Sequence, residues 1–190
     1  HLAKELKINL YENHEVSSFD IYGNIDNKKF DKVILAVGPW TKLLLEKNKI
    51  KSLKNIDYIK GSHLIIDRKI NSGLMFKGFC QSRYVFALPY KGFTLLGTTE
   101  VKVRSPDKPK IDTNEENYLI DSFNQTFKDP ISSKDIVSAY SGVRPLIRSK
   151  YDFHKSSRDF FIQQDSNLIS IFGGKWTTSP SIARKIATIV

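Results

Sequence analysis

Cysteine is almost absent from this chain. Cys80 is the single cysteine among 190 residues, which excludes an internal disulfide bond and is typical of proteins from reducing compartments. We expect Cys80 to be a small buried hydrophobic residue rather than a reactive thiol. Histidines are also few, at 4, and no spacing of cysteine, histidine and acidic residues resembles a metal site. We therefore predict no bound metal.

Long apolar runs are missing as well. No run reaches the roughly 20 residues that a helix needs to span a bilayer, and the N-terminus does not resemble a signal peptide. The chain starts without an initiator methionine and stops within what reads as a helix, so we expect it to be a fragment of a longer protein. Its 40% hydrophobic and 12% aromatic residues are typical of a folded globular protein.

Acidic residues are outnumbered by basic ones. The chain has 20 acidic and 30 basic residues and a net charge of +10, a balance that favours phosphorylated metabolites, acidic lipid surfaces or nucleic acid as partners. Lysines account for 23 of the basic residues and often lie in stretches rich in Lys, Asn and Ile. This pattern indicates compositional drift rather than a binding patch, so the 7 arginines are the better guide to a site.

Two short segments at opposite ends of the chain read as buried strands that run into a glycine turn and a helix. Residues 31–37 form a continuous apolar run, which predicts a strand buried on both faces, and a helix is predicted at residues 41–49. Residues 168–172 repeat the design, followed by a helix with Ser179 as the expected N-cap and Pro180 in its first turn. Two such units predict one layer of a parallel α/β domain.

The stretch between these units predicts antiparallel β-structure. Residues 101–112 lack periodicity and read as a loop, and a helix is predicted at residues 114–127, where Thr113 and Glu116 form a capping box. We expect the strand aromatics Tyr84, Phe86 and Phe93 to lie in the core. Strands are predicted at residues 62–67, 83–100 (folded as a hairpin), 136–141 and 159–164.

The expected architecture is therefore an antiparallel α+β domain inserted into a parallel α/β domain. Residues 1–48 are the first segment of the α/β domain, and residues 49–164 are the antiparallel domain. Residues 165–190 return to the α/β domain with one strand and one helix. Ligands commonly bind in the cleft between two such domains.

The run Phe-Gly-Gly-Lys-Trp-Thr-Thr at residues 172–178 is the most informative motif. A strand, a glycine turn and a helix N-terminus together offer free backbone N–H groups and the positive end of a helix dipole. The ammonium of Lys175 adds a mobile positive charge. The motif therefore predicts a negatively charged cofactor or substrate at this turn.

Three further residues are candidates for chemistry. Arg144 precedes a proline, which excludes the helical conformation; its guanidinium either grips a phosphate or carboxylate through paired hydrogen bonds, or is a solvated strand-end arginine. Arg158 is either a second clamp or the partner of Asp159. His63 opens an apolar strand and either accepts a proton through its neutral imidazole or is a half-buried histidine bonded to backbone.

Taken in order, these segments resemble the FAD-dependent (respiratory) glycerol-3-phosphate dehydrogenases, which are flavoproteins with a D-amino-acid-oxidase-like fold. The resemblance covers the chain from about residue 31. Its six motifs are Ala-Val-Gly-Pro-Trp at 36–40, Lys-Gly-Ser-His at 60–63, Leu-Gly-Thr-Thr-Glu at 96–100, Tyr-Ser-Gly-Val-Arg-Pro-Leu at 140–146, Ser-Arg-Asp at 157–159 and the glycine turn at 172–178.

The resemblance implies an enzyme that oxidises glycerol 3-phosphate to dihydroxyacetone phosphate and passes the electrons through FAD to membrane quinone. It implies that Arg144, Arg158 and Lys175 line the substrate pocket with His63 close by, and that Arg144 and His63 are the catalytic candidates, between which we do not assign the base. It further implies an FAD-binding α/β domain whose cofactor contacts are Gly38, Gly173, Gly174, Lys175, Trp176, Thr177 and Thr178.

The resemblance also implies the partners and the location. They are a phosphorylated small-molecule substrate, membrane quinone as the electron acceptor, a second copy of the chain in a homodimer, and a cytoplasmic protein that is peripheral on the inner face of the membrane. Nucleic acid is not an expected partner. Its recognition needs arginines and aromatics interleaved on one exposed face, whereas most aromatics here read as core.

The sequence departs from the family in one important place. The G-x-G-x-x-G fingerprint that cradles the FAD pyrophosphate is absent. We therefore expect these residues alone to bind FAD weakly and to show no turnover. Two alternatives stay open: an FAD-dependent amino-acid or hydroxy-acid oxidase of the same fold, and a basic anion-binding module without catalysis.

Overall fold

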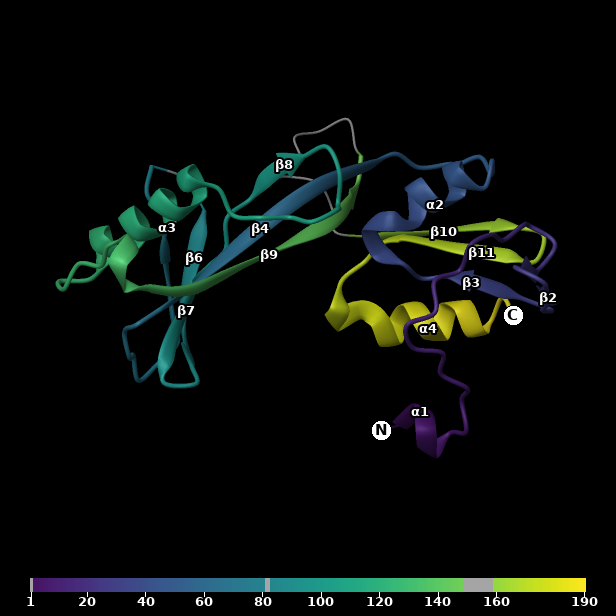
Figure 1. Ribbon diagram of the computed structural model, residues 1–190, viewed down its shortest axis with the longest axis horizontal. Helices are drawn as coiled ribbons and strands as arrows, with labels where there is room; N and C mark the ends of the chain where they lie inside the picture. Colours follow the sequence, from purple (N-terminus) through teal and green to yellow (C-terminus); the bar gives the residue numbers. More distant parts are fainter. Residues whose placement is uncertain (1, 81–82, 149–158) are drawn as a thin grey trace.

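The computed structural model describes residues 2–80, 83–148 and 159–190, which form two lobes joined by long strands (Figure 1). The larger lobe holds a six-stranded antiparallel sheet, and the smaller lobe a three-stranded sheet. The elements in chain order are α1 (Leu2–Glu5), β1 (Asn24–Ile25), β2 (Lys28–Lys29), β3 (Val33–Leu35), η1 (Gly38–Trp40), α2 (Thr41–Lys47), β4 (Ile56–Ile66), β5 (Leu74–Lys77), β6 (Tyr84–Tyr90), β7 (Phe93–Gly97), β8 (Val101–Val103), α3 (Thr113–Thr126), η2 (Ser133–Asp135), β9 (Ile136–Ile147), β10 (Phe160–Asp165), β11 (Leu168–Gly173), η4 (Trp176–Thr178) and α4 (Ser179–Ala187).

Strands β4 and β9 are the two long central strands of the larger lobe. They pair antiparallel from Ile56 opposite Ile147 to Ile66 opposite Ile136, and they run from this lobe toward the smaller one (Figure 1). On its other edge β4 pairs with β7 and β8, and β7 leads through β6 to β5. The expected hairpin is confirmed as β6 and β7, whereas the expected loop at residues 101–112 contains β8, so that part of the prediction is wrong.

Helix α3 covers one face of the large sheet and completes its core. Leu119 and Phe123 of the helix are almost fully buried, against strand residues that include Leu64, Val85 and Leu96. The capping box is formed by Asp112 and Glu115, so the prediction of Thr113 and Glu116 is wrong by one residue. The carboxylate of Asp112 also lies 3.3 Å from Lys60 Nζ, a contact from outside the helix.

The opposite face of the large sheet is open. Tyr84 is 58% exposed and Phe86 is 42% exposed, so the prediction that these aromatics lie in the core is wrong. Successive residues of a strand point to opposite faces, and it is Val85 and Ala87 that point toward α3 and are buried. The apolar character of β6 on both faces made the two sides indistinguishable in the sequence.

The smaller lobe is a layered α/β unit. Its strand order is β10-β11-β3, with β3 parallel to β11 and β10 antiparallel to it. Helices α2 and α4 lie on opposite faces of this sheet (Figure 1). Strand β10 precedes the expected domain boundary at residue 165 but pairs with β11 along its whole length. The predicted fold class, an antiparallel sheet combined with part of a parallel α/β domain, is confirmed.

Three local predictions are wrong. Ile34 is 46% exposed rather than buried, because it lines the open groove between the sheet and α4. Helix α4 has Thr178 rather than Ser179 as its N-cap, since Ser179 Oγ donates to the carbonyl of Trp176 at 2.7 Å. Cys80 is exposed and unpaired.

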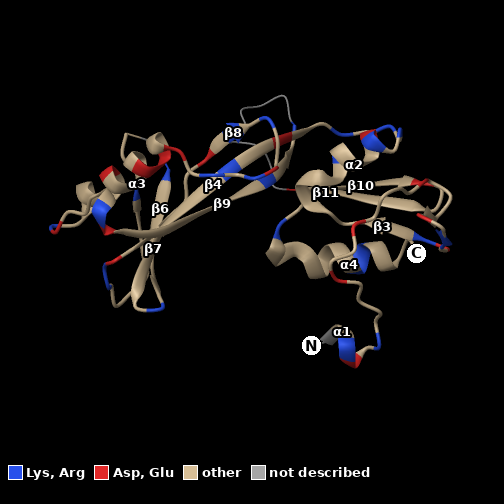
Figure 2. Cartoon of the chain, in the orientation of Figure 1, with Lys and Arg blue, Asp and Glu red and all other residues tan. Residues whose placement is uncertain are grey.

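The two lobes are also linked by side chains. The indole Nε1 of Trp40 donates to Asp107 Oδ1 at 2.7 Å, which connects η1 to the segment after β8. Basic residues are spread over both lobes among acidic ones (Figure 2), in keeping with compositional drift. Among the residues that the structure describes, no helix is long and apolar enough to cross a membrane.

Candidate functional site

A row of residues crosses the open face of the large sheet. The register places Phe86 opposite Gly97, Gly97 opposite His63, and His63 opposite Tyr140, on strands β6, β7, β4 and β9. Residues directly opposite in neighbouring strands point to the same face. The His63 ring stacks on Tyr140, with 4.9 Å between ring centroids and 8° between planes.

The absence of a side chain at Gly97 makes room for His63. A Cβ at position 97 would lie 2.3 Å from His63 Cδ2, a separation that real atoms do not reach. Burial, and then the positive charge of Arg144, lower the pKa of His63 below its ordinary value of 6.5. The imidazole is therefore neutral at pH 7, and its buried Nδ1 has no hydrogen-bond partner within the described part of the chain.

Arg144 lies beside His63 and is held by an ion pair. Its Nη2 is 3.0 Å from Glu100 Oε1, and the other oxygen of that carboxylate is 2.9 Å from Arg83 Nη2. The guanidinium passes over Gly61, where a Cβ would lie 3.1 Å from Nη2. Arg144 is thus an oriented guanidinium with 34% of its side chain exposed, rather than a freely solvated strand-end arginine.

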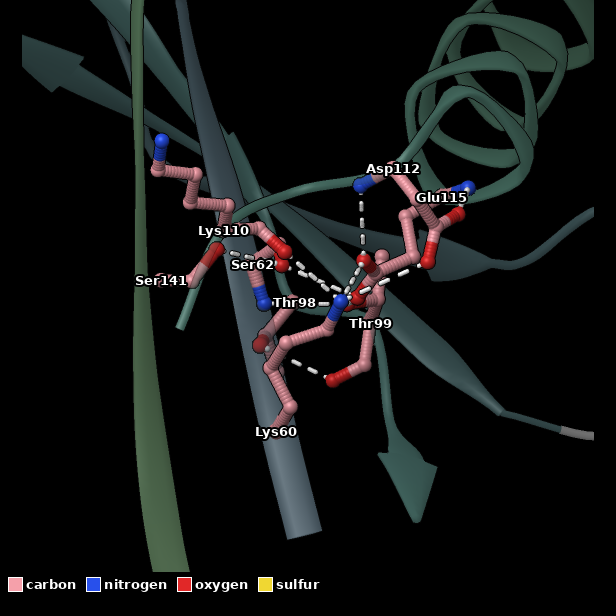
Figure 3. Close-up of polar contacts among 8 residues, drawn as sticks. All are labelled: Lys60, Ser62, Thr98, Thr99, Lys110, Asp112, Glu115 and Ser141. Atoms are coloured by element: carbon pink, nitrogen blue, oxygen red, sulfur yellow. Dashed lines mark hydrogen bonds and ion pairs between the residues drawn. The ribbon is translucent and has the colours of Figure 1, made fainter. Parts of the chain in front are cut away.

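Beneath this site, on the face covered by α3, lies a polar cluster that the sequence did not point to. Glu115 is buried and bonded to Lys60, Ser62 and Thr99, and Ser62 is bonded in turn to Ser141 (Figure 3). Tyr140, Glu100 and Arg83 also join the site, although none of them was a predicted site residue. The available signal was motif membership, because Tyr140 shares a motif with Arg144, and Glu100 ends the Leu-Gly-Thr-Thr-Glu motif of the same resemblance.

The predicted cofactor residues lie elsewhere, on a groove of about 920 Å³ between the small sheet and α4. Its walls are mainly apolar, from Ile34 and Ile171 of the sheet and Ile182 and Ile186 of the helix. Pro145, which directly follows Arg144, also lines the groove. The predicted residues on the groove are Gly38, Gly173, Gly174, Lys175 and Trp176; Thr177 and Thr178 belong to the turn beside it.

The glycine turn is shaped by the packing of the chain itself. Gly173 and Gly174 have φ values of 70° and 84°, which favour glycine. A Cβ at Gly173 would lie 2.6 Å from the carbonyl oxygen of Asp159, and one at Gly174 would lie 2.8 Å from Ile182 Cδ1. At Gly38, by contrast, an added Cβ would meet nothing within 4 Å, so this residue faces open space.

The anion site expected at this turn has three of its backbone donors already in use. The N–H of Lys175 donates to Thr178 Oγ1 at 3.0 Å, that of Gly174 to the carbonyl of Asp159 at 3.3 Å, and that of Thr178 to the carbonyl of Lys175 at 3.0 Å. The side chain of Lys175 is exposed and that of Trp176 is 91% exposed. The structure thus brings His63 and Arg144 together and gathers the predicted cofactor residues at a second place, while Arg158 lies outside the described residues.

Comparison with known proteins connects the chain to one family of enzymes. Residues 1–189 match the family model described as FAD dependent oxidoreductase. The chain is 34% identical over 165 residues to the aerobic glycerol-3-phosphate dehydrogenase of Bacillus subtilis, an alignment that covers 84% of this chain and 30% of the relative. It is 36% identical over 163 residues to the Escherichia coli protein of the same name, covering 80% and 32%. The chain therefore spans about a third of the length of the curated relatives it matches.

Solved structures show the same fold. The glycerol-3-phosphate dehydrogenase from Bacillus halodurans complexed with FAD superposes with a TM-score of 0.72 at 30% identity, over 83% of this chain and 31% of that chain. The L-alpha-glycerophosphate oxidase from Mycoplasma pneumoniae with FAD bound superposes with a TM-score of 0.68 at 20% identity, over 96% of this chain and 51% of that chain. The second likeness shows the fold alone.

Proposed function

The chain belongs to the family of FAD-dependent oxidoreductases, and we propose that it forms the substrate-facing part of a glycerol-3-phosphate dehydrogenase. Such an enzyme oxidises the secondary alcohol of glycerol 3-phosphate to the ketone of dihydroxyacetone phosphate. The observation that carries the proposal is the placement of a neutral histidine beside an oriented arginine on one open sheet face. The relatives named aerobic glycerol-3-phosphate dehydrogenase support this choice of substrate.

The groove of the smaller lobe fits FAD. Its apolar walls suit a flat aromatic ring system, Gly38 leaves open space for it, and Lys175 offers a positive charge at one end. When bound, FAD supplies the acceptor for the hydride. We propose that the contacts come from Gly38, Gly173, Gly174, Lys175, Trp176, Thr177 and Thr178, and that residues 1–48 and 165–190 form the cofactor side of the protein and residues 49–164 its substrate side.

His63 accepts the hydroxyl proton in this proposal. Its pKa is lowered by burial and by Arg144, so the ring is unprotonated at neutral pH and has a free lone pair. The stacked ring of Tyr140 restricts rotation of the imidazole. Gly97 leaves the space that the ring occupies, because any side chain at this position would displace it.

Arg144 polarises the reacting oxygen, which carries growing negative charge as its proton leaves. The ion pair with Glu100 restricts the guanidinium to one orientation, which lowers the entropy lost on binding. The substrate phosphate is assigned to Lys175 and Arg158, because ammonium and guanidinium groups are the usual partners of phosphate.

The same proposal names the partners and the location. A phosphorylated small molecule is the substrate, and a membrane quinone receives the electrons. A lipid-soluble acceptor requires the enzyme to work at a membrane surface, so we propose a cytoplasmic protein that is peripheral on the inner face of the membrane and that acts as a homodimer.

Steady-state kinetics test the proposal on the chain as it occurs in its full-length protein, with FAD and an artificial electron acceptor. We expect kcat/KM for glycerol 3-phosphate to exceed that for glycerol by about 10⁴-fold, because a site built to pair with phosphate rejects analogues that lack it. His63→Asn should lower kcat by about 10²- to 10⁴-fold.

His14→Asn is the matched control, since His14 is exposed on the N-terminal segment, and it should leave kcat unchanged. Turnover of D-amino acids above that of glycerol 3-phosphate would overturn the substrate and favour the oxidase alternative. Full activity of the His63→Asn variant would overturn the assignment of the proton acceptor.

A further inference from the structure

Glu115, at the start of α3, is a buried charged residue that the proposed function does not use. It is 3% exposed. One of its oxygens, Oε1, accepts hydrogen bonds from Ser62 Oγ at 2.9 Å and from Thr99 Oγ1 at 2.6 Å (Figure 3). The carboxylate therefore joins α3 to strand β4 and to the segment between β7 and β8.

The second oxygen of Glu115 is also fully engaged. Oε2 lies 2.7 Å from Lys60 Nζ and accepts the backbone N–H of Asp112 at 3.1 Å. Lys60 is itself 7% exposed and donates to the carbonyl of Lys110 at 2.7 Å. Burial disfavours its ammonium, but the hydrogen bond and charge of Glu115, with those of Asp112, raise the pKa of Lys60 above its ordinary value.

The network reaches β9 through two hydroxyls. Ser62 Oγ lies 2.8 Å from Ser141 Oγ on β9, and the backbone N–H of Ser62 donates to Thr99 Oγ1 at 2.9 Å. We call Glu115, Lys60, Ser62, Thr99 and Ser141 the Glu115 network. Each bond to the carboxylate involves a full charge, so it is stronger than a neutral hydrogen bond.

Each hydroxyl residue of the network is next in sequence to a residue of the candidate site. Ser62 precedes His63, Ser141 follows Tyr140, and Thr99 precedes Glu100, which holds Arg144. In β4 and β9, where neighbours point to opposite faces, the network lies on the α3 side and His63 and Tyr140 on the open side. A shift of either strand at the network must therefore move a site residue by a similar amount.

We propose that Glu115 is a positioning residue, which holds the strand residues behind His63, Tyr140 and Glu100 in register and so sets the geometry of the open face. Its relevance to catalysis rests on the proposed function, whereas the geometric effect does not. The carboxylate accepts three hydrogen bonds and pairs with one ammonium. All four contacts are made only when the partners hold one arrangement, and a rigid site requires such support from the residues behind it.

The experiment is NMR of the histidine rings in the 190-residue chain, with Glu115→Gln as the main variant. An amide cannot accept bonds from both hydroxyls and also neutralise Lys60. We expect the His63 resonances to lose the ring-current shift from Tyr140. The titration midpoint of His63 should move upward toward the ordinary value of histidine, because water reaches the ring as the strands separate. The titratable groups that face this ring, Arg144 and Tyr140, are unchanged in the variant.

Two further variants keep the test open if Glu115→Gln does not fold. Ser141→Ala and Ser62→Ala each remove one hydroxyl without uncovering a buried charge, and we expect smaller His63 shifts in the same direction. Glu46→Gln is the control for the charge change, since Glu46 is exposed on α2 and pairs with Lys42 at 2.6 Å. Ser72→Ala, in an exposed loop, is the control for the serine variants.

The decisive comparison is between stability and site geometry. Variants of the network that lower the unfolding temperature but leave the His63 shifts and midpoint unchanged would overturn the proposal and make Glu115 a structural residue only. The readout uses neither FAD nor substrate. A failure here is therefore distinct from a failure of the proposed activity, which only the kinetic assay measures.

Discussion

The two places where the predicted site residues gather differ in how firmly the chain itself holds their side chains. On the large sheet His63 and Arg144 each have fixed neighbours, namely Tyr140 and Glu100, and a buried charged network lies directly behind them. On the smaller lobe Trp176 is 91% exposed and the groove beside it has a volume of about 920 Å³. The proposed substrate side is organised by the chain itself, whereas the proposed cofactor side is an open surface.

The difference follows from how each region is covered. Helix α3 packs over the large sheet and removes water from the network, which strengthens each electrostatic contact. The glycine turn is held by backbone geometry and by its contact with Ile182, but the side chains of Lys175 and Trp176 face solvent. We therefore expect mutations to disturb the side-chain geometry of the proposed substrate side. On the proposed cofactor side we expect ligand binding to change that geometry.

The largest expected effect comes from removing the packing of α3. Phe123 is 1% exposed and stacks on Phe127 at 4.1 Å, so Phe123→Ala should lower the free energy of unfolding by about 3–5 kcal/mol. Urea denaturation measures the change. Phe30→Ala, at a residue that is 43% exposed, should cost much less; equal losses would contradict a core centred on α3.

A smaller effect is expected from filling the space beside His63. Gly97→Ala places a methyl group 2.3 Å from His63 Cδ2, and overpacking of this kind costs about 1–3 kcal/mol. The matched control is Gly142→Ala on β9, where an added Cβ meets nothing within 4 Å. Denaturation of both variants is compared, and the preorganised site is contradicted by equal stability of the two.

The pH dependence of stability gives a third test. Burial and Arg144 lower the pKa of His63 in the folded chain, so the unfolded chain binds this proton more readily. The free energy of unfolding therefore rises with pH between the folded value and about 6.5, and it is lost as pH falls through that window. His63→Gln should flatten this slope in chemical denaturation series. A variant that keeps the full slope would assign the effect to other groups.

The smallest effect on stability is expected at the open side. Trp176→Ala removes a side chain that is 91% exposed, so the free energy of unfolding should change by no more than about 0.5 kcal/mol. In the FAD-loaded dehydrogenase that we propose, the same variant should lower the affinity for FAD, which flavin fluorescence measures. Destabilisation as large as that of Gly97→Ala would show that the turn is packed in a way the open groove does not suggest.

Several elements could be predicted from local patterns. The hairpin of β6 and β7, strand β11 and helices α2 and α4 all lie where apolar periodicity and turn residues indicated. The misses have a common cause in contacts from distant residues. Asp112 caps α3 in place of Thr113, and its side chain also faces Lys60, 52 residues away. Tyr84 is exposed because α3 covers only one face of the sheet, and Cys80 is exposed in the turn after β5.

By itself the sequence determined the kinds of element, their order and the residue types of the site, because turn chemistry, strand alternation and motif spacing are local properties. It also pointed to His63, Arg144 and the glycine turn. Tertiary structure alone decided which face of each strand is covered and which distant strands are neighbours. The bond between Ser62 and Glu115 spans 53 positions and that between Ser62 and Ser141 spans 79, so only the register of β4 with β9 and the docking of α3 could place a buried charge behind the site.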